Sequence, residues 1–434
     1  MTAPEVRWPD SLWAAVTPPG PALPELAGAN KADVIVIGGG FTGLSTALHL
    51  REAGVDVAIV EAMEPGWGAS GRNNGQVIPT LSRVDPEEIV ARHGASGERF
   101  AAMLRDSASA LFDIVKRYQL NAEQEQAGWV QPVHSPGRIR IAERRVRQWG
   151  KLGAPVELLS REQARDMLGS EAWYGGFWNK SGGHINPLAL ARELARAVVK
   201  AGGRIYARSP VQSFERRGHR WVVKTIGGEI SGRALVVATN AYSGEFSASL
   251  VPDIAREVVP ILSWQMSTQP LSDNVRKTII PARQAMSDTH GELYFARYDA
   301  RNRLITGGAV IGPGDQPARL KARVSERLQR LWPQIGEIKF DHVWNGYVGM
   351  TTDFLPRIHR LGPDAYGWTG CNGRAVALTI PLGNELAKAV RGVPESELAL
   401  PFTTPAPLPL HGILRKLAPL MLLVYRRRDA REIA

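Results

Sequence analysis

A glycine-rich turn between two apolar segments constrains the fold of this chain more than any other feature of its sequence. Residues 33–37 end in four consecutive apolar side chains, as a buried parallel strand does. The turn 38–43 follows directly, and from there to Ala53-Gly54 the apolar residues recur with helical spacing. Residues 55–60 form a second apolar run. This order predicts a strand–helix–strand unit in an α/β domain with a mostly parallel sheet.

The turn fits the Gly-x-Gly-x-x-Gly pattern by which such units bind a dinucleotide. Gly38 permits the tight turn, Gly40 lets the backbone approach a pyrophosphate, and Gly43 lets the helix pack closely on the strand. Phe41 and Thr42 begin the helix, whose unpaired N–H groups would bind the phosphates. The alternative is a structural glycine turn that binds no ligand.

Glu61 ends the second apolar run, 18 residues after Gly43. A carboxylate in this place can accept hydrogen bonds from both ribose hydroxyls, which favours an adenosine without a 2′-phosphate. We therefore expect Glu61 and the adjacent Ala62 to contact the adenosine. The alternative is an ordinary carboxylate at the end of a strand.

The composition excludes several functional classes. The 434 residues suffice for two or three domains, and 44% hydrophobic with 22% charged residues is typical of a globular enzyme. The net charge of +11 comes without any nucleic-acid-binding motif, so we expect no nucleic-acid partner. The single cysteine excludes a disulfide within the chain, and no two of the nine histidines lie within four residues of each other, so we expect no metal site. The absence of a signal-peptide pattern and of any apolar run of about 18 residues predicts a cytoplasmic protein without a transmembrane segment.

Changes in pattern predict a discontinuous nucleotide-binding domain into which an antiparallel, β-rich substrate domain is inserted, an α/β plus α+β fold. Helical spacing returns at 187–200 and apolar strands at 204–207 and 234–238, whereas alternating segments predominate later. The predicted boundaries are 1–30 for an extended N-terminal arm, 31–85, 184–242 and 341–395 for the nucleotide-binding domain, 86–183 and 243–340 for the substrate domain, and 396–434 for a C-terminal helical tail.

The tail contains the longest apolar stretch, residues 417–425, between Lys416 and Arg426. Leu420, Leu423 and Val424 share one helical face, which predicts a helix packed on the protein. The alternative is a helix that makes peripheral contact with a membrane surface.

The glycine-rich loop 66–76 identifies the dinucleotide. Its residues Gly-Trp-Gly-Ala-Ser-Gly-Arg-Asn-Asn-Gly-Gln resemble the GxGASGRNGGQ loop of the FAD-dependent D-amino-acid oxidase-like superfamily of amine oxidoreductases. Asn74 stands where those proteins usually have glycine. The resemblance implies a Rossmann-like FAD-binding domain and FAD contacts from four residues of the loop, namely Ser70, Gly71, Arg72 and Asn73.

Further segments resemble the superfamily in the same order along residues 31–395. These are residues 182–187, 236–242, 344–356 and 370–374. The resemblance implies FAD contacts from Val211, Thr239, Gly370, Gly373 and Arg374. The segments FTGLSTALHL and GWGASGRN, together with the basic tail, are most similar to the subgroup that includes gamma-glutamylputrescine oxidoreductase. Ala375, where glycine is usual, is a second departure.

The resemblance implies oxidation of an amine by hydride transfer to flavin N5, giving an imine that is hydrolysed to an aldehyde or keto product. Oxygen or a quinone would re-oxidise the flavin. In the sarcosine-oxidase-like branch a cysteine carries the flavin, and alignment places Gly346 at or near its position. Because the only thiol, Cys371, lies elsewhere in the sequence, we expect noncovalent FAD.

The substrate class depends on a missing arginine. The branch that oxidises free amino acids commonly has an arginine that binds the substrate carboxylate, and Val348 occupies the aligned position here. The sequence therefore predicts an amine without an α-carboxylate, such as a polyamine or γ-glutamyl polyamine. If Arg297 or Arg374 replaces the missing arginine, the alternative is a D-amino-acid, glycine or secondary amino-acid oxidase. A second alternative is a flavoprotein subunit that catalyses nothing.

Three residues are candidates for positioning the substrate. His184 lies in a glycine-rich turn that it could instead stabilise, and Tyr294 lies on a strand whose inward face the sequence does not identify. Trp344, with Trp264, could form an aromatic wall for a cationic amine, although core packing is the simpler role.

Overall fold

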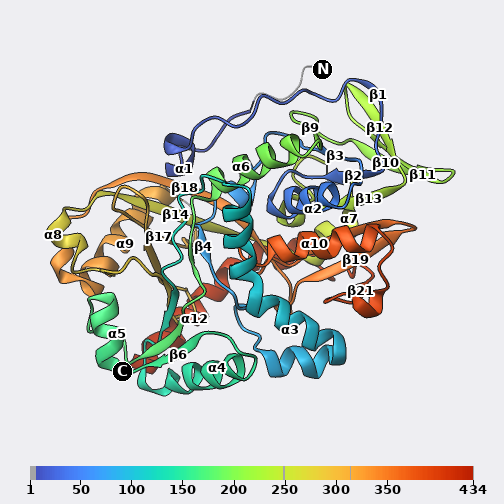
Figure 1. Ribbon diagram of the computed structural model, residues 1–434. Helices are drawn as coiled ribbons and strands as arrows, with labels where there is room; N and C mark the ends of the chain where they lie inside the picture. Colours follow the sequence, from blue (N-terminus) through green and yellow to red (C-terminus); the bar gives the residue numbers. More distant parts are fainter. Residues whose placement is uncertain (1–5, 248–249, 313, 434) are drawn as a thin grey trace.

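The computed structural model describes residues 6–247, 250–312 and 314–433. Seven strands form the sheet of the first domain in the order β21-β19-β20-β13-β2-β3-β9 (Figure 1). Strands β20, β13, β2, β3 and β9 are mutually parallel, and β19 runs antiparallel to β20. The bounds are Val34–Ile37 (β2), Val57–Val60 (β3), Arg204–Tyr206 (β9), Ala234–Val237 (β13), Arg357–Gly362 (β19), Ala365–Thr369 (β20) and Phe402–Thr403 (β21). Every residue of β2, β3 and β13 is buried, as their continuous apolar sequences predict.

Three helices pack together beside this sheet. Helix α2 (Phe41–Glu52) contacts both α6 (Pro187–Lys200) and α10 (Thr379–Val390) (Figure 1). Helix α6 has the predicted bounds because Asn186 caps its N-terminus and Pro187 takes the first helical position. The predicted strand–helix–strand unit is thus confirmed as β2, α2 and β3.

The N-terminal arm is only partly extended, contrary to prediction. Residues 1–5 lie outside the described residues, and Leu12–Val16 form helix α1, capped by the Ser11 hydroxyl. Trp13 is completely buried, and its indole N–H donates to the Asn73 carbonyl at 2.8 Å. This anchoring explains why the proline-rich arm contains a helix.

The arm also contributes a strand to a small sheet of order β1-β12-β11-β10. Strand β1 (Gly28–Lys31) runs parallel to β12 (Gly228–Gly232), and β11 (Arg220–Lys224) and β10 (Ser213–Arg217) continue the sheet as antiparallel neighbours. This sheet lies beside the parallel one at the side opposite the second domain (Figure 1).

The second domain is built on an eight-stranded sheet of order β18-β14-β17-β16-β15-β5-β7-β6. All neighbours in it are antiparallel except β15 and β5, which confirms the predicted class. The bounds are Trp129–Pro132 (β5), Val156–Leu159 (β6), Gly176–Asn179 (β7), Val259–Pro270 (β14), Ala285–Ser287 (β15), Phe295–Tyr298 (β16), Arg303–Gly308 (β17) and Phe340–Met350 (β18). Strand β18 had been expected in the FAD-binding domain, but it pairs with β14 from Val259 to Thr268. The chain therefore returns to the first domain only after Met350.

The remaining elements connect or cover the two sheets. Helix α3 is one long element with non-helical backbone at Gly94. The bounds are Pro86–Arg117 (α3), Ile139–Lys151 (α4), Arg161–Leu168 (α5), Pro252–Glu257 (α7), Asp273–Arg276 (α8), Gln316–Leu331 (α9), Gln76–Val77 (β4) and Gly183–His184 (β8).

The C-terminal tail is helical, but its packing differs from the prediction. It consists of α11 (His411–Leu417), a short 3₁₀ turn and α12 (Met421–Ile433). The three side chains expected to pack are exposed: Leu420 by 46%, Leu423 by 44% and Val424 by 56%. The reason is that α12 is attached through charged groups, including an ion pair of Arg426 with the buried Glu292. Within the described residues, no helix is both long enough and apolar enough to cross a membrane.

Candidate active site

A large cavity lies where the parallel strands of the first domain end. Gly38, Glu61 and Thr239, which line it, follow the carboxyl ends of β2, β3 and β13. Strand β2 lies between β3, which follows it directly in the sequence, and β13, which comes much later. The strand order reverses here, and open α/β sheets bind ligands in the crevice at such a point. Strands β14 and β18 of the second domain supply further walls. The space between protein atoms in this cavity is about 1680 Å³, part of it open to solvent.

The start of α2 has the features of a pyrophosphate site. Gly40 precedes the helix without any side-chain cap, and a Cβ atom on it would lie 2.9 Å from the Ser70 hydroxyl. The Phe41 N–H donates to this hydroxyl at 3.0 Å. The Thr42 hydroxyl oxygen is buried at the cavity and has no hydrogen-bond partner among the described residues. A free helix N-terminus with an orphaned hydroxyl fits a bound phosphate.

Glu61 is held in place by backbone groups. Its carboxylate accepts the Gly39 N–H at 2.5 Å and the Met63 N–H at 2.9 Å. Burial raises the pKa of the Glu61 carboxyl, and these N–H donors oppose the shift. Ala62 and Val211 line the cavity beside it, so the arrangement suits an adenosine.

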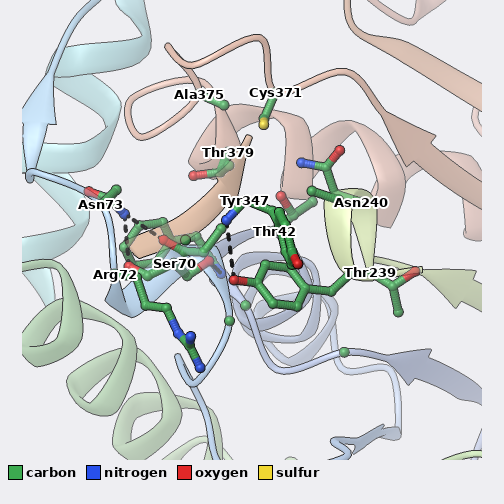
Figure 2. A pocket seen from close by; sticks show the side chains of 18 of the residues that line it. Thr42, Ser70, Arg72, Asn73, Thr239, Asn240, Tyr347, Cys371, Ala375 and Thr379 are labelled. Atoms are coloured by element: carbon green, nitrogen blue, oxygen red, sulfur yellow. Dashed lines mark hydrogen bonds between the residues drawn. The ribbon is translucent and has the colours of Figure 1, made fainter. Parts of the chain in front are cut away.

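The flavin loop is shaped by asparagine side chains. The Asn73 amide donates to the carbonyls of Ala69 and Ser70 at 3.1 and 2.9 Å, as Figure 2 shows in part. The departure at Asn74 is accommodated because the positive φ of the turn falls on Gly75, at 79°. The backbone carbonyl of Asn74 accepts a hydrogen bond from the buried Arg297 of the second domain.

Arg72 and Arg374 are the cationic side chains on the described cavity wall. The Arg72 guanidinium lies 4.2 Å from the Trp67 ring and donates through Nε to the Trp67 carbonyl. Arg374 donates to the Thr80 hydroxyl and the Leu81 carbonyl, both at 3.2 Å. Burial lowers the pKa of Arg374 well below its usual value.

The structure brings most of the expected FAD contacts to one cavity. The residues on its wall are Gly38, Gly40, Phe41, Thr42, Glu61, Ala62, Ser70, Arg72, Asn73, Val211, Thr239, Gly373 and Arg374. Gly43, Gly71 and Gly370 lie behind the wall instead. A Cβ atom would approach a backbone carbonyl oxygen to 2.0 Å at Gly43 and to 2.3 Å at Gly71, so these glycines allow close packing.

The three residues expected to position the substrate are not on the described wall. His184 is buried, with Nε2 3.0 Å from the Arg283 carbonyl, so it stabilises its turn. Tyr294 stacks on His290 at 4.0 Å. Trp344 is buried, like Trp264, and donates its indole N–H to the Arg72 carbonyl at 2.8 Å. Because each ring is occupied by protein contacts, we replace the expectation of substrate contact with these structural roles.

The cavity also has an aromatic wall, which was not predicted from the sequence. Trp67, Tyr242, Phe246 and Tyr347 form it, with Tyr242 in edge contact with Trp67 at 6.1 Å and with Tyr347 at 5.5 Å. The Tyr347 N–H donates to the Tyr242 hydroxyl at 3.4 Å (Figure 2). Their positions in the sequence could have indicated this wall, because Tyr242 closely follows a strand that ends at the cofactor and Tyr347 follows Gly346.

Two glutamines give the cavity uncharged polar groups. Gln265 and Gln76 are buried on its wall, and the carbonyl oxygen of each side chain has no partner in the described part of the chain. Their amide nitrogens are engaged, with the Ser263 hydroxyl at 3.0 Å and the Met286 carbonyl at 2.9 Å. Both side chains can therefore accept a hydrogen bond from a ligand.

Away from the cavity, His134, Asp429 and Glu432 have side-chain atoms within 4.8 Å of one another, a spacing that a metal ion could bridge. Arg138 already pairs with Glu432, so a guanidinium occupies the place of a cation. We therefore retain the prediction that the protein needs no metal.

Comparison with known proteins identifies the family. The sequence profile of the DAO family, described as FAD dependent oxidoreductase, matches residues 33–389. The chain belongs to this family. It is 33% identical over 362 residues to gamma-glutamylputrescine oxidoreductase of Escherichia coli (strain K12), covering 83% of this chain and 84% of that protein. It is 24% identical over 341 residues to glycine oxidase of Geobacillus kaustophilus (strain HTA426), covering 75% and 84%.

Solved structures share the fold. The L-proline dehydrogenase from P. horikoshii superposes with a TM-score of 0.70 at 20% identity, covering 85% of this chain and 94% of that one. The protein is thus an FAD-dependent oxidoreductase that acts on amines or amino acids. Bound FAD supplies the acceptor for the hydride that leaves the substrate. The residues described above would hold it, from the Glu61 end to the turn at Gly373.

Cys371 belongs to the turn 370–374, which the sequence resemblance implies lies beside the flavin. The thiol is on the cavity wall, where its sulfur accepts the Gly349 N–H at 3.2 Å (Figure 2). We still predict noncovalent FAD, because Gly346 occupies the place of the linking cysteine. Acid precipitation of the wild type should release all flavin into the supernatant, and Cys371→Ser should remain yellow. Flavin that stays with the wild-type pellet but not with the Cys371→Ser pellet would show a covalent bond.

Proposed function

We propose that this enzyme oxidises an amine that has no carboxylate on the reacting carbon, such as a polyamine or a γ-glutamyl polyamine. The observation that carries the proposal is Val348 on the cavity wall, at the aligned position of the arginine that binds amino-acid substrates. A branched apolar side chain cannot pair with a carboxylate. Losing such a charge-assisted contact costs about 1.5–3 kcal/mol, or roughly ten- to hundred-fold in affinity.

The two arginines that could replace the missing one are engaged elsewhere. Arg297 is 1% exposed and donates to the carbonyls of Asn74, Ile185 and Tyr298. Arg374 is on the wall, but it is tied to the segment at Thr80 and lies 4.8 Å from the Trp129 ring. These contacts support an amine substrate over a free amino acid.

The other wall groups suit a substrate rich in N–H donors. The carbonyl oxygens of Gln76 and Gln265 can accept hydrogen bonds from an amine, and the rings of Tyr242 and Tyr347 favour a cation at their faces. Arg72, whose terminal nitrogens form no ion pair with a carboxylate of the described residues, is available to the distant carboxylate of a γ-glutamyl group. The similarity to gamma-glutamylputrescine oxidoreductase supports the same choice.

Anaerobic flavin reduction tests the proposal. Putrescine, γ-glutamylputrescine, D-alanine, D-proline and glycine are each mixed with the purified enzyme, and bleaching of the flavin is followed by stopped-flow absorbance. We expect the amines to reduce the flavin at least about ten-fold faster, by the affinity difference above. Admitting oxygen or a quinone afterwards identifies the acceptor that restores the colour.

The outcomes separate the competing functions. Faster reduction by D-alanine, D-proline or glycine would establish an amino-acid oxidase, for which the similarity to glycine oxidase is the specific reason. If no amine or amino acid in the panel bleaches the flavin while dithionite does, a flavoprotein subunit without catalytic activity becomes the better description.

A further inference from the structure

The C-terminal segment 410–433 carries an exposed apolar stripe. Its members recur at helical spacing along α11, the following turn and α12, and each is between 41% and 72% exposed. They are Leu410, Ile413, Leu414, Leu417, Leu420, Met421, Leu423 and Val424. Elsewhere on the described surface, large exposed apolar side chains are scattered singly or rim the cavity. Contiguous apolar surface of this kind marks a binding site.

The segment is attached to the protein by its polar side. Arg426 pairs with Glu292 at 2.7 Å, and the buried Asp429 accepts the Gly291 N–H at 2.7 Å. Glu432 forms two hydrogen bonds with Arg138. A surface helix of a globular protein normally buries its apolar face and exposes its charges. Here the arrangement is reversed, and the contacts to residues 291–292 fix it.

Unpaired cations flank the stripe. Arg415, Lys416, Arg427 and Arg431 are exposed, and none has an ion-pair partner in the part of the chain that the structure describes. Residues 411–433 contain six Lys or Arg and two Asp or Glu, a net charge of +4. Both acidic side chains face the protein, at Gly291 and Arg138. The outward surface is thus apolar and positively charged.

This combination selects one occupant. A second copy of the chain would bring the same cations against these, and like charges in apposition oppose association. An anionic lipid surface complements both features, because the apolar side chains insert among the acyl chains and the cations bind the lipid phosphates. Since no described helix can span a membrane, the segment would lie in the plane of the interface.

We propose that residues 410–433 dock this enzyme on anionic phospholipid membranes as an interfacial helix. Docking there brings the active site near the lipid. Gly291 and Glu292 bind the segment, and Leu293, the next residue, lines the cavity.

Vesicle co-sedimentation of the FAD-loaded full chain tests the proposal. We compare vesicles of phosphatidylcholine with vesicles of phosphatidylcholine and phosphatidylglycerol in equal parts, at low and high salt. We expect at least about ten-fold tighter binding to the anionic vesicles, weakening as salt is raised. Arg427→Glu should weaken this binding by about five-fold or more, the contribution of a single cation near such a surface. Leu417→Glu combined with Val424→Glu should remove binding to both kinds of vesicle.

Ile226→Glu is the matched control, because Ile226 is 43% exposed and lies outside the segment. It should bind vesicles as the wild type does. All variants change exposed side chains that are not part of the cavity wall, so their flavin spectra should match the wild type and confirm folding. Equal sedimentation with and without anionic vesicles would overturn the proposal. So would a dimer, seen by light scattering, that Leu417→Glu dissociates.

Discussion

Gly43→Ala is expected to weaken FAD binding by roughly hundred-fold or more, so that the protein is purified with little flavin colour. A Cβ atom at this position would lie 2.0 Å from the carbonyl oxygen of Gly38 and 3.3 Å from the Val36 side chain. Both belong to the strand and turn on which α2 packs, and backbone at that distance cannot yield as a flexible side chain can. Helix α2 must therefore move away from β2 and carry its N-terminal N–H groups out of register with the pyrophosphate.

The expected loss is large because several contacts move together. Hydrogen bonds to charged groups contribute about 1.5–3 kcal/mol each, so losing two of them weakens FAD binding by roughly hundred-fold or more. The measurement is the FAD dissociation constant of the apoprotein by flavin fluorescence, with far-UV circular dichroism as a check of folding. Gly137→Ala is the control, because an added Cβ there meets nothing within 4 Å. Wild-type FAD affinity in Gly43→Ala would contradict the packing argument.

Arg297→Met is expected to reduce both the stability of the protein and its affinity for FAD. The guanidinium is 4.6 Å from the Trp13 ring and donates to three backbone carbonyls, those of Asn74, Ile185 and Tyr298. It thereby joins β16 of the second domain to the flavin loop of the first. Burial lowers its pKa to about 10, so it remains charged at neutral pH.

Methionine of similar length leaves these carbonyls without donors. An orphaned buried acceptor costs about 1–3 kcal/mol, so we expect a loss of roughly 3 kcal/mol or more in the free energy of unfolding. The flavin loop also loses its anchor at Asn74, so the FAD dissociation constant should rise. Urea denaturation and flavin fluorescence measure the two effects.

Arg327→Met is the matched control for this prediction. Arg327 is also buried, and it donates to the Thr306 hydroxyl and the Gly307 carbonyl within the second domain, away from the flavin loop. The Arg327→Met variant should have a lower free energy of unfolding and an unchanged affinity for FAD. If Arg297→Met behaves in the same way, the link between Arg297 and the flavin loop is not the one that matters for the cofactor.

The nucleotide half of the site could be predicted from the sequence because its geometry is local. Gly38, Gly40 and Glu61 fall within one strand–helix–strand unit, where a turn, a helix start and a strand end are determined by neighbours in the chain. The resemblance of the later motifs extended this prediction to the turn at Gly373, which lies on the cavity wall.

The substrate half could not be predicted in the same way. Whether Trp344 or Tyr347 faces the cavity depends on which side of β18 meets the flavin domain, and the alternation of a strand is the same for both choices. Trp344 turns to the Arg72 carbonyl, 272 residues away in sequence, and Tyr347 turns to Tyr242. No local pattern contains such pairings.

The tail shows the same division. The sequence predicted a helical tail within residues 396–434 and a face shared by Leu420, Leu423 and Val424, because both follow from spacing. Which face of the tail is turned outward depends on the packed fold, because Glu292 and Arg138 bind its charged side from positions far away in the chain. Helical periodicity gives the relative positions of side chains on one element, whereas the partners that orient this element come from the packed fold.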